Sequence, residues 1–127
     1  MRVNNNVNAA HQGFSPLNNI FSGNGVVMGF IDTGIDFTHD DFKNPNGSTR
    51  IIALWDQTLG VSSNTPQPYG YGQHWDSVGI NAGLPTNHND QWGHGTTVTG
   101  TGAGNGSAVG RYKGCLLYTS PSPRDSL

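Results

Sequence analysis

Residues 26–36 read Val-Val-Met-Gly-Phe-Ile-Asp-Thr-Gly-Ile-Asp, an apolar run that ends at an acid. The run 26–31 is continuously apolar rather than alternating, and a Gly-Asn-Gly turn precedes it. A short apolar run bounded by turn residues is typical of a strand buried on both faces, as in a parallel sheet. We therefore predict a strand over 26–31. Asp32 would lie at its carboxyl end, where open α/β sheets place their chemistry.

A histidine with little steric cover lies further along the chain, in Gly93-His94-Gly95. A carboxylate beside an imidazole fixes the tautomer of the ring and stabilises the imidazolium formed during catalysis. Histidine is a natural general base because its ordinary pKa is close to neutrality. Asp32 and His94 are thus candidates for two of the three groups of a nucleophilic hydrolase. Taken singly, the aspartate could equally be a turn residue and the histidine a satisfied polar residue.

Residues 94–104 read His-Gly-Thr-Thr-Val-Thr-Gly-Thr-Gly-Ala-Gly. Threonine and valine are β-branched, and each glycine disfavours a helix interior by about 1 kcal/mol, so propensity alone favours a strand or a loop. Small residues on every side also suit a helix that packs closely against its neighbours. The composition of the segment leaves both interpretations open.

Other segments give weaker signals. We predict a strand over 50–55 after a turn at 44–47, and a short helical turn over 16–21. Residues 57–92 show no convincing element, and a loop of that length in a compact domain is usually functional. Its aromatic residues are predicted to line a surface cleft, or alternatively to cover a sheet edge: Tyr69, Tyr71, Trp75 and Trp92.

Bulk properties exclude several classes of protein. The 127 residues are enough for one domain, and a net charge of −2 gives no nucleic-acid or polybasic membrane footprint. No apolar stretch approaches the length of a membrane span, and the first residues hold no signal-peptide core. Cys115 is the single cysteine, so the chain has no internal disulfide.

Two motifs together resemble a known family. Residues 30–36, Phe-Ile-Asp-Thr-Gly-Ile-Asp, with His39 and Asp41 after them, resemble the aspartate motif of the subtilases, the subtilisin-like serine proteases. Residues 94–101 resemble the histidine motif of that family, in the same order along the chain. Residues 46–58 resemble a bacterial branch of it. The resemblance covers about Gly13 to Gly114.

This resemblance implies a three-layer α/β/α fold around a mainly parallel sheet, with Asp32 as the orienting acid and His94 as the general base. It also implies that His94 opens a buried helix, which favours helix for 94–104. Thr97 stands where the family often has a second histidine, and Asp40 where it often has proline. Neither position belongs to the triad.

The resemblance also bears on ligands and location. It implies a protein or peptide substrate, no required cofactor, and secretion or attachment to the cell envelope. Asp41 corresponds to a position that ligates calcium in some subtilases, so structural calcium is a candidate. One aspartate with nearby asparagines falls short of the six to eight oxygens that calcium takes, and a turn or capping role is the alternative.

The resemblance ends near Gly114. Residues 1–114 are therefore interpreted as the N-terminal part of a peptidase domain, and the Ser/Pro-rich residues 115–127 as a non-native tail. The oxyanion-hole asparagine and the Gly-Thr-Ser nucleophile motif of the family are not seen, and Ser120, Ser122 and Ser126 lack that context. We expect no peptidase activity from this chain by itself.

Two other functions compete with a serine endopeptidase. The motif Asp32-Thr33-Gly34 superficially fits an aspartic protease of the retroviral type, although Ile35 and Asp36 do not continue that pattern. A subtilase-like module without catalysis, acting as a binding partner, is the second alternative. Inhibitor sensitivity separates the first, and the presence of the Gly-Thr-Ser motif in the reading frame separates the second.

Overall fold

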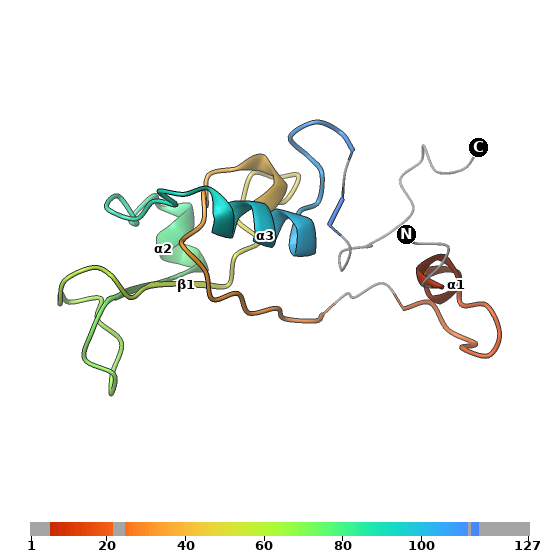
Figure 1. Ribbon diagram of the computed structural model, residues 1–127, viewed down its shortest axis with the longest axis horizontal. Coiled ribbons are helices and arrows are strands. Elements are labelled where there is room, and N and C mark those ends of the chain that lie inside the picture. The colour runs from red at the N-terminus through yellow and green to blue at the C-terminus, as the bar shows by residue number, and fades with distance from the viewer. Residues whose placement is uncertain (1–5, 22–24, 112, 115–127) are drawn as a thin grey trace.

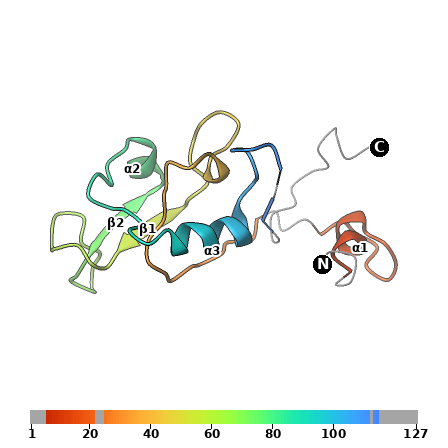
Figure 2. The same ribbon diagram turned by 45° about the horizontal axis from the view of Figure 1, so that its top comes forward.

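The computed structural model describes residues 6–21, 25–111 and 113–114. Its elements follow one another as helix α1 (Val7–Gln12), a 3-10 turn η1 (Asp40–Phe42), strands β1 (Ala53–Asp56) and β2 (Gln73–Asp76), and helices α2 (Ser77–Asn81) and α3 (His94–Ala103). Helix α1 and the loop after it lie at one end, away from the other elements, in both Figure 1 and Figure 2.

The strands β1 and β2 form an antiparallel pair in which Leu54 faces Trp75 and Trp55 faces His74. A two-stranded ribbon is marginally stable alone, and here α2 packs against it. Trp75 and Ile80 are buried where helix and ribbon meet. The N-cap of helix α2 is Asp76, whose Oδ1 accepts the backbone N–H of Gly79 at 2.8 Å and so caps the first turn.

Helix α3 confirms the helix that the family resemblance implied for 94–104. Side-chain hydroxyls satisfy backbone carbonyls along it: Thr97 donates to the carbonyl of Gly93 at 2.7 Å, and Thr101 to that of Thr97 at 2.8 Å. The extended segment 25–36 runs beside the helix (Figure 2). Helix α3 packs so closely on this segment that a Cβ at Gly95 would overlap the carbonyl oxygen of Gly34. Tertiary packing therefore overrides the poor helix propensity of the sequence.

A half-buried arginine joins three parts of the chain. The Nη1 of Arg50 donates to the backbone carbonyls of Asp41 at 3.0 Å and Ala103 at 2.9 Å. Burial lowers the pKa of this guanidinium, and the nearby Asp41 carboxylate acts in the opposite direction. The contact fixes the C-terminal end of α3 against η1 and the strand that follows.

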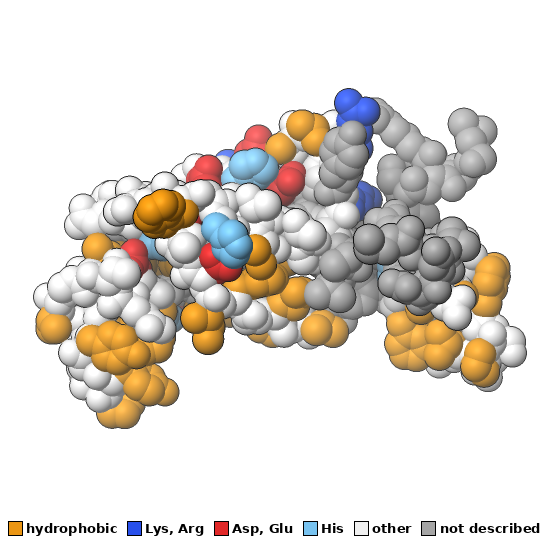
Figure 3. All heavy atoms as spheres, viewed as in Figure 1, with side chains coloured by type: hydrophobic (Ala, Val, Ile, Leu, Met, Phe, Trp, Pro, Cys, Tyr) orange, Lys and Arg blue, Asp and Glu red, His pale blue; other side chains and the backbone are white. Residues whose placement is uncertain are grey.

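The predicted strand over 26–31 is wrong for this structure. The segment has no strand hydrogen bonding, and its side chains are largely exposed, with Val27 at 72% and Ile31 at 98%. A strand exists through hydrogen bonds to neighbours, and in the described residues the single sheet consists of β1 and β2. An apolar run indicates side chains that favour burial. Among the described residues, no neighbouring strand covers the side chains of 26–31. Hydrophobic side chains are visible at several separate places on the face of the molecule that Figure 3 shows.

Three other expectations need correction. The short helix of the N-terminal segment lies at Val7–Gln12, whereas 16–21 is irregular. The strand predicted at 50–55 begins later, at Ala53. Residues 57–92 contain β2 and α2, which sequence reasoning missed because β2 is short and polar except for Trp75.

The predicted turn at 44–47 is confirmed, since Gly47 donates its N–H to the carbonyl of Asn44 at 2.9 Å. Residues 115–127, with Cys115 and the serines of the tail, lie outside the described residues. None of the helices in the described part combines the length and the apolar character that a membrane crossing requires.

The glycine contact predicts a sharp contrast between two substitutions in α3. Gly95→Ala forces the helix away from Gly34 and should lower the free energy of unfolding by about 1–3 kcal/mol. Gly100→Ala, with open space around its Cβ position, should raise that free energy by about 0.5–1 kcal/mol through better helix propensity. Urea unfolding followed by circular dichroism measures both. Equal effects of the two substitutions would contradict this packing.

Candidate active site

Asp32 and His94 lie side by side although they are far apart in the sequence. Asp32 follows the extended segment 26–31, and His94 is the first residue of α3. The Nδ1 of His94 is 2.6 Å from Oδ1 of Asp32, which also accepts the backbone N–H of Thr33 at 2.7 Å. An ionised carboxylate can only accept a hydrogen bond, so Nδ1 is the donor and carries a proton. In the neutral ring, Nε2 therefore has a free lone pair.

The two side chains differ in their exposure to solvent. The carboxylate of Asp32 is 16% exposed and the imidazole of His94 is 65% exposed. A largely shielded carboxylate holds one edge of the ring, while the ring itself is mostly open to solvent. The arrangement can therefore take a proton at Nε2 from a group that approaches from solvent.

Each partner shifts the pKa of the other. The hydrogen bond from His94 lowers the pKa of Asp32, and the Thr33 N–H lowers it further. The pKa of His94 is raised, first by its hydrogen bond to Asp32 and then by the charge of Asp32, with a contribution from the charge of Asp90. The pair thus stabilises the imidazolium form of the ring.

Asp90 is a residue of this site that sequence reasoning missed. Its Oδ1 accepts from the hydroxyl of Thr33 at 2.8 Å and from the N–H of Gly93 at 3.1 Å. Its Oδ2 accepts from the N–H and the hydroxyl of Thr96, at 2.8 and 2.7 Å. Burial alone would raise the pKa of Asp90, but the hydrogen bonds from Thr96, Thr33 and Gly93 outweigh it and lower the pKa to about 2.

A signal for Asp90 was present in the sequence. An acid close to a helix start can accept from the first backbone N–H groups, which have no intrahelical partners, and Asp90 lies three residues before the N-cap Gly93. The segment 94–104 was not assigned as helix from its composition, so its start and the acid before it went unnoticed.

A second aspartate–histidine pair, Asp56 and His88, contacts the loop that follows Asp32. The Nδ1 of His88 is 2.6 Å from Oδ2 of Asp56, and its Nε2 lies 3.3 Å from the backbone nitrogen of Ile35 and 3.2 Å from its carbonyl oxygen. Both side chains are nearly buried. Burial raises the pKa of Asp56, but hydrogen bonds from Thr58 and His88 prevail and hold it below its usual range. This pair anchors the loop of Asp32 to strand β1.

Asp41 lies in η1, and its carboxylate Oδ1 accepts the backbone N–H of Ala108 at 2.9 Å. In the described ranges, no group of three or more histidine, cysteine, aspartate or glutamate side chains could hold a metal ion. One carboxylate already engaged by a backbone N–H does not make a calcium site from these residues. Calcium at Asp41 stays a prediction.

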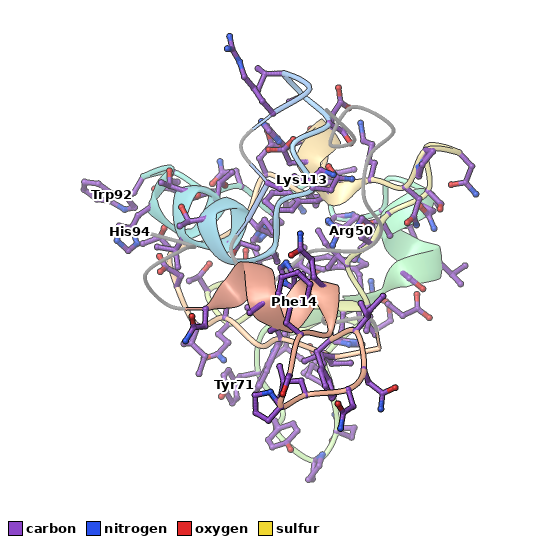
Figure 4. The ribbon with its side chains drawn as sticks, turned by 90° about the vertical axis from the view of Figure 1, so that its right-hand side faces the viewer. Phe14, Arg50, Tyr71, Trp92, His94 and Lys113 are labelled. Carbon is purple, nitrogen blue, oxygen red and sulfur yellow. The ribbon has the colours of Figure 1, made fainter. Side chains whose placement is uncertain are left out.

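The aromatic side chains of 57–92 lie in different parts of the structure. Trp75 is in the core, and Trp55 packs on Tyr69 and Tyr71 with ring centroids 5.2 and 4.9 Å apart. Trp92 is 82% exposed, and Figure 4 shows it close to His94 and far from Tyr71. A single cleft lined by all of these rings is therefore not what the structure shows.

Comparison with known proteins gives consistent matches. The model of the subtilase family matches residues 23–121. Subtilisin-like protease SBT2.2 of Arabidopsis thaliana is 34% identical over 98 residues, which cover 66% of this chain and 11% of that protein. Subtilisin-like protease SBT2.3 of the same plant is also 34% identical over 98 residues, covering 66% of this chain and 12% of its own length. The chain thus spans about a tenth of the curated relatives it matches.

The contact between His94 and Asp32 predicts a measurable titration. The pKa of the His94 imidazole should lie above 6.5 and fall in Asp32→Asn, as followed by NMR of the ring protons. The raised pKa of His94 means that the pair stabilises the fold fully below pH 6.5 and loses this effect as the pH rises through the folded pKa. The lowered pKa of Asp32 means that its contribution is present above pH 3.8 and is lost as the pH falls through the folded pKa. An unchanged His94 pKa in Asp32→Asn would contradict the contact.

Proposed function

The chain belongs to the subtilase family, and from this premise we propose that it supplies the orienting acid, Asp32, and the general base, His94, of a serine endopeptidase. The family is one of serine proteases with an α/β fold, and the curated relatives are named subtilisin-like proteases. The observation that carries the proposal is the 2.6 Å contact between Nδ1 of His94 and Asp32, with the other edge of the ring exposed.

In the proposed mechanism, Nε2 of His94 takes the proton of a serine hydroxyl as that oxygen attacks the peptide carbonyl. His94 then gives the proton to the leaving amine. Asp32 keeps the ring in the tautomer that leaves Nε2 unprotonated and stabilises the imidazolium between the two steps. Each residue therefore does what its hydrogen bond and pKa shift favour.

The serine must come from elsewhere. Among the described residues, no serine donates a hydrogen bond to His94, whose side chain contacts the carboxylate of Asp32. We propose that the nucleophile and the oxyanion-hole asparagine belong to another part of the peptidase domain, of which residues 1–114 form the N-terminal part. A mechanism that uses Asp32 as one of two aspartic protease acids fits poorly, because its carboxylate is held by an imidazole.

The remaining elements of the proposal follow from the family. A three-layer α/β/α arrangement would cover the apolar side chains that 26–31 exposes here. We also propose a protein or peptide substrate and a location outside the cell or at its envelope. No step of the mechanism requires a metal or a cofactor.

The proposal is tested on a longer protein that contains this sequence and the complete subtilase domain. A fluorophosphonate should label it and block peptide hydrolysis, whereas a pepstatin-like statine should not. His94→Ala should lower kcat by about 10⁴-fold or more, because removal of one triad member leaves only the residual acceleration. His74→Ala, on β2, is the matched control and should retain activity. Inhibition by the statine alone would establish the aspartic alternative, and absence of both labelling and hydrolysis would establish the non-catalytic module.

The chain of 127 residues by itself should neither hydrolyse peptides nor react with the fluorophosphonate, because the described residues offer no serine to His94. Incubation with a fluorogenic peptide library measures the hydrolysis. Turnover that disappears in His94→Ala would contradict this expectation and require a nucleophile within the chain.

A further inference from the structure

We propose that Asp90 is a positioning residue that holds His94 and Asp32 in register, by binding the loop of the acid and the first turn of the base's helix with one carboxylate. The inference rests on the proposed roles of Asp32 and His94. It assigns a part in the site to a residue that touches neither of them through a hydrogen bond.

The carboxylate of Asp90 reaches both halves of the site. On one side it accepts from the hydroxyl of Thr33, which directly follows Asp32. On the other side it accepts from the N–H of Gly93 and from the N–H and hydroxyl of Thr96, on either side of His94 in the chain. Four donors thus converge on one side chain, and charge-assisted hydrogen bonds of this kind are stronger than neutral ones.

The network continues directly between the two halves. The hydroxyl of Thr33, while donating to Asp90, accepts the N–H of Gly95 at 3.1 Å. The hydroxyl of Thr96, also a donor to Asp90, accepts the N–H of Asp36 at 2.8 Å. Asp90 therefore fixes the direction in which each hydroxyl donates, and so leaves each hydroxyl oxygen as an acceptor for the opposite segment.

The contact of His94 with Asp32 needs this support because it is open to water. An imidazole that is 65% exposed can exchange its carboxylate partner for solvent at little cost. The packing of Gly95 on Gly34 sets how near the first turn of the helix comes, and Arg50 holds the far end of the helix at the carbonyl of Ala103. The bonds through Asp90, placed on both sides of His94, orient the first turn itself against the loop of Asp32.

The experiment uses the chain of 127 residues and NMR, so that no peptidase activity is needed. The proton between Nδ1 of His94 and Asp32 should give a far-downfield resonance, and the pKa of His94 should lie above 6.5. In Asp90→Asn the resonance should be lost and the pKa should fall toward 6.5. Asp40→Asn, an exposed aspartate paired with Lys43, is the matched control and should change neither.

A second pair of variants separates position from charge and guards against loss of folding in Asp90→Asn. Thr33→Val removes the hydroxyl that links Asp90 to the loop and leaves every charge in place. It should also abolish the downfield resonance, and Thr33→Ser, which keeps the hydroxyl, should restore it. In the longer protein, Asp90→Asn should lower kcat by about 10²-fold with KM little changed, as expected for a base displaced by a fraction of its contact distance.

The outcomes distinguish this inference from the proposed function. If the downfield resonance remains and the pKa of His94 is unchanged in both Asp90→Asn and Thr33→Val, the positioning role is overturned. The endopeptidase proposal is then unaffected. Loss of the resonance in both variants of the 127-residue chain, while the longer protein neither hydrolyses peptides nor reacts with the fluorophosphonate, would support the positioning role and refute the endopeptidase. Loss in Asp90→Asn alone would mean that charge and not position is responsible, which also overturns the inference.

Discussion

The backbone contact between Gly34 and Gly95 is the constraint on which the site depends. A Cβ on Gly95 would overlap the carbonyl oxygen of Gly34, and one on Gly34 would lie 2.7 Å from the carbonyl oxygen of Asn89. Gly34 also has a φ of 138°, which other residues rarely adopt. Because both side chains are absent, the loop and helix α3 approach closely enough for the carboxylate of Asp32 to reach the imidazole of His94. The hydrogen bonds from Thr33 to Asp90, from Gly95 to Thr33 and from Asp36 to Thr96 join the same two segments.

The two aspartate–histidine pairs show that a short distance from Nδ1 to a carboxylate does not by itself identify a general base. Both have an Nδ1 to carboxylate distance of 2.6 Å. The His88 side chain is 3% exposed and its Nε2 lies against the backbone of Ile35, so both nitrogens are engaged inside the protein. The His94 side chain is 65% exposed, and its Nε2 has no partner among the described residues. Burial therefore makes one pair an anchor, and exposure leaves the other able to exchange a proton.

The sequence singled out two side chains that meet in the structure, Asp32 and His94, whereas much of the fold around them could not be predicted, for physical reasons. Asp32 and His94 stood out because each lies in a short stretch whose residue types suit one kind of chemistry, and the structure brings them together. The strand over 26–31 was wrong because an apolar run signals burial, whereas a strand needs a partner that local sequence does not specify. Strand β2 was missed because its only large buried side chain is Trp75, so its residues show no apolar alternation. The strand forms through its pairing with β1, which local sequence does not reveal. Helix α3 could not be derived from propensity, because its stability comes from tertiary contacts.

The composition of α3 makes sense once those contacts are considered. Threonines are poor helix formers partly because their hydroxyls compete for backbone groups, yet the hydroxyl of Thr96 in the first turn joins Asp90 to Asp36. Towards the C-terminal end, the place of a side chain at Gly102 is taken by the ring of Phe30, 3.0 Å from the Cβ position. Three residues that weaken the isolated helix, Gly95, Thr96 and Gly102, therefore join it to the segment that carries Asp32. Alanine or leucine at these three positions would favour the isolated helix, but it would remove the contacts that hold His94 against Asp32.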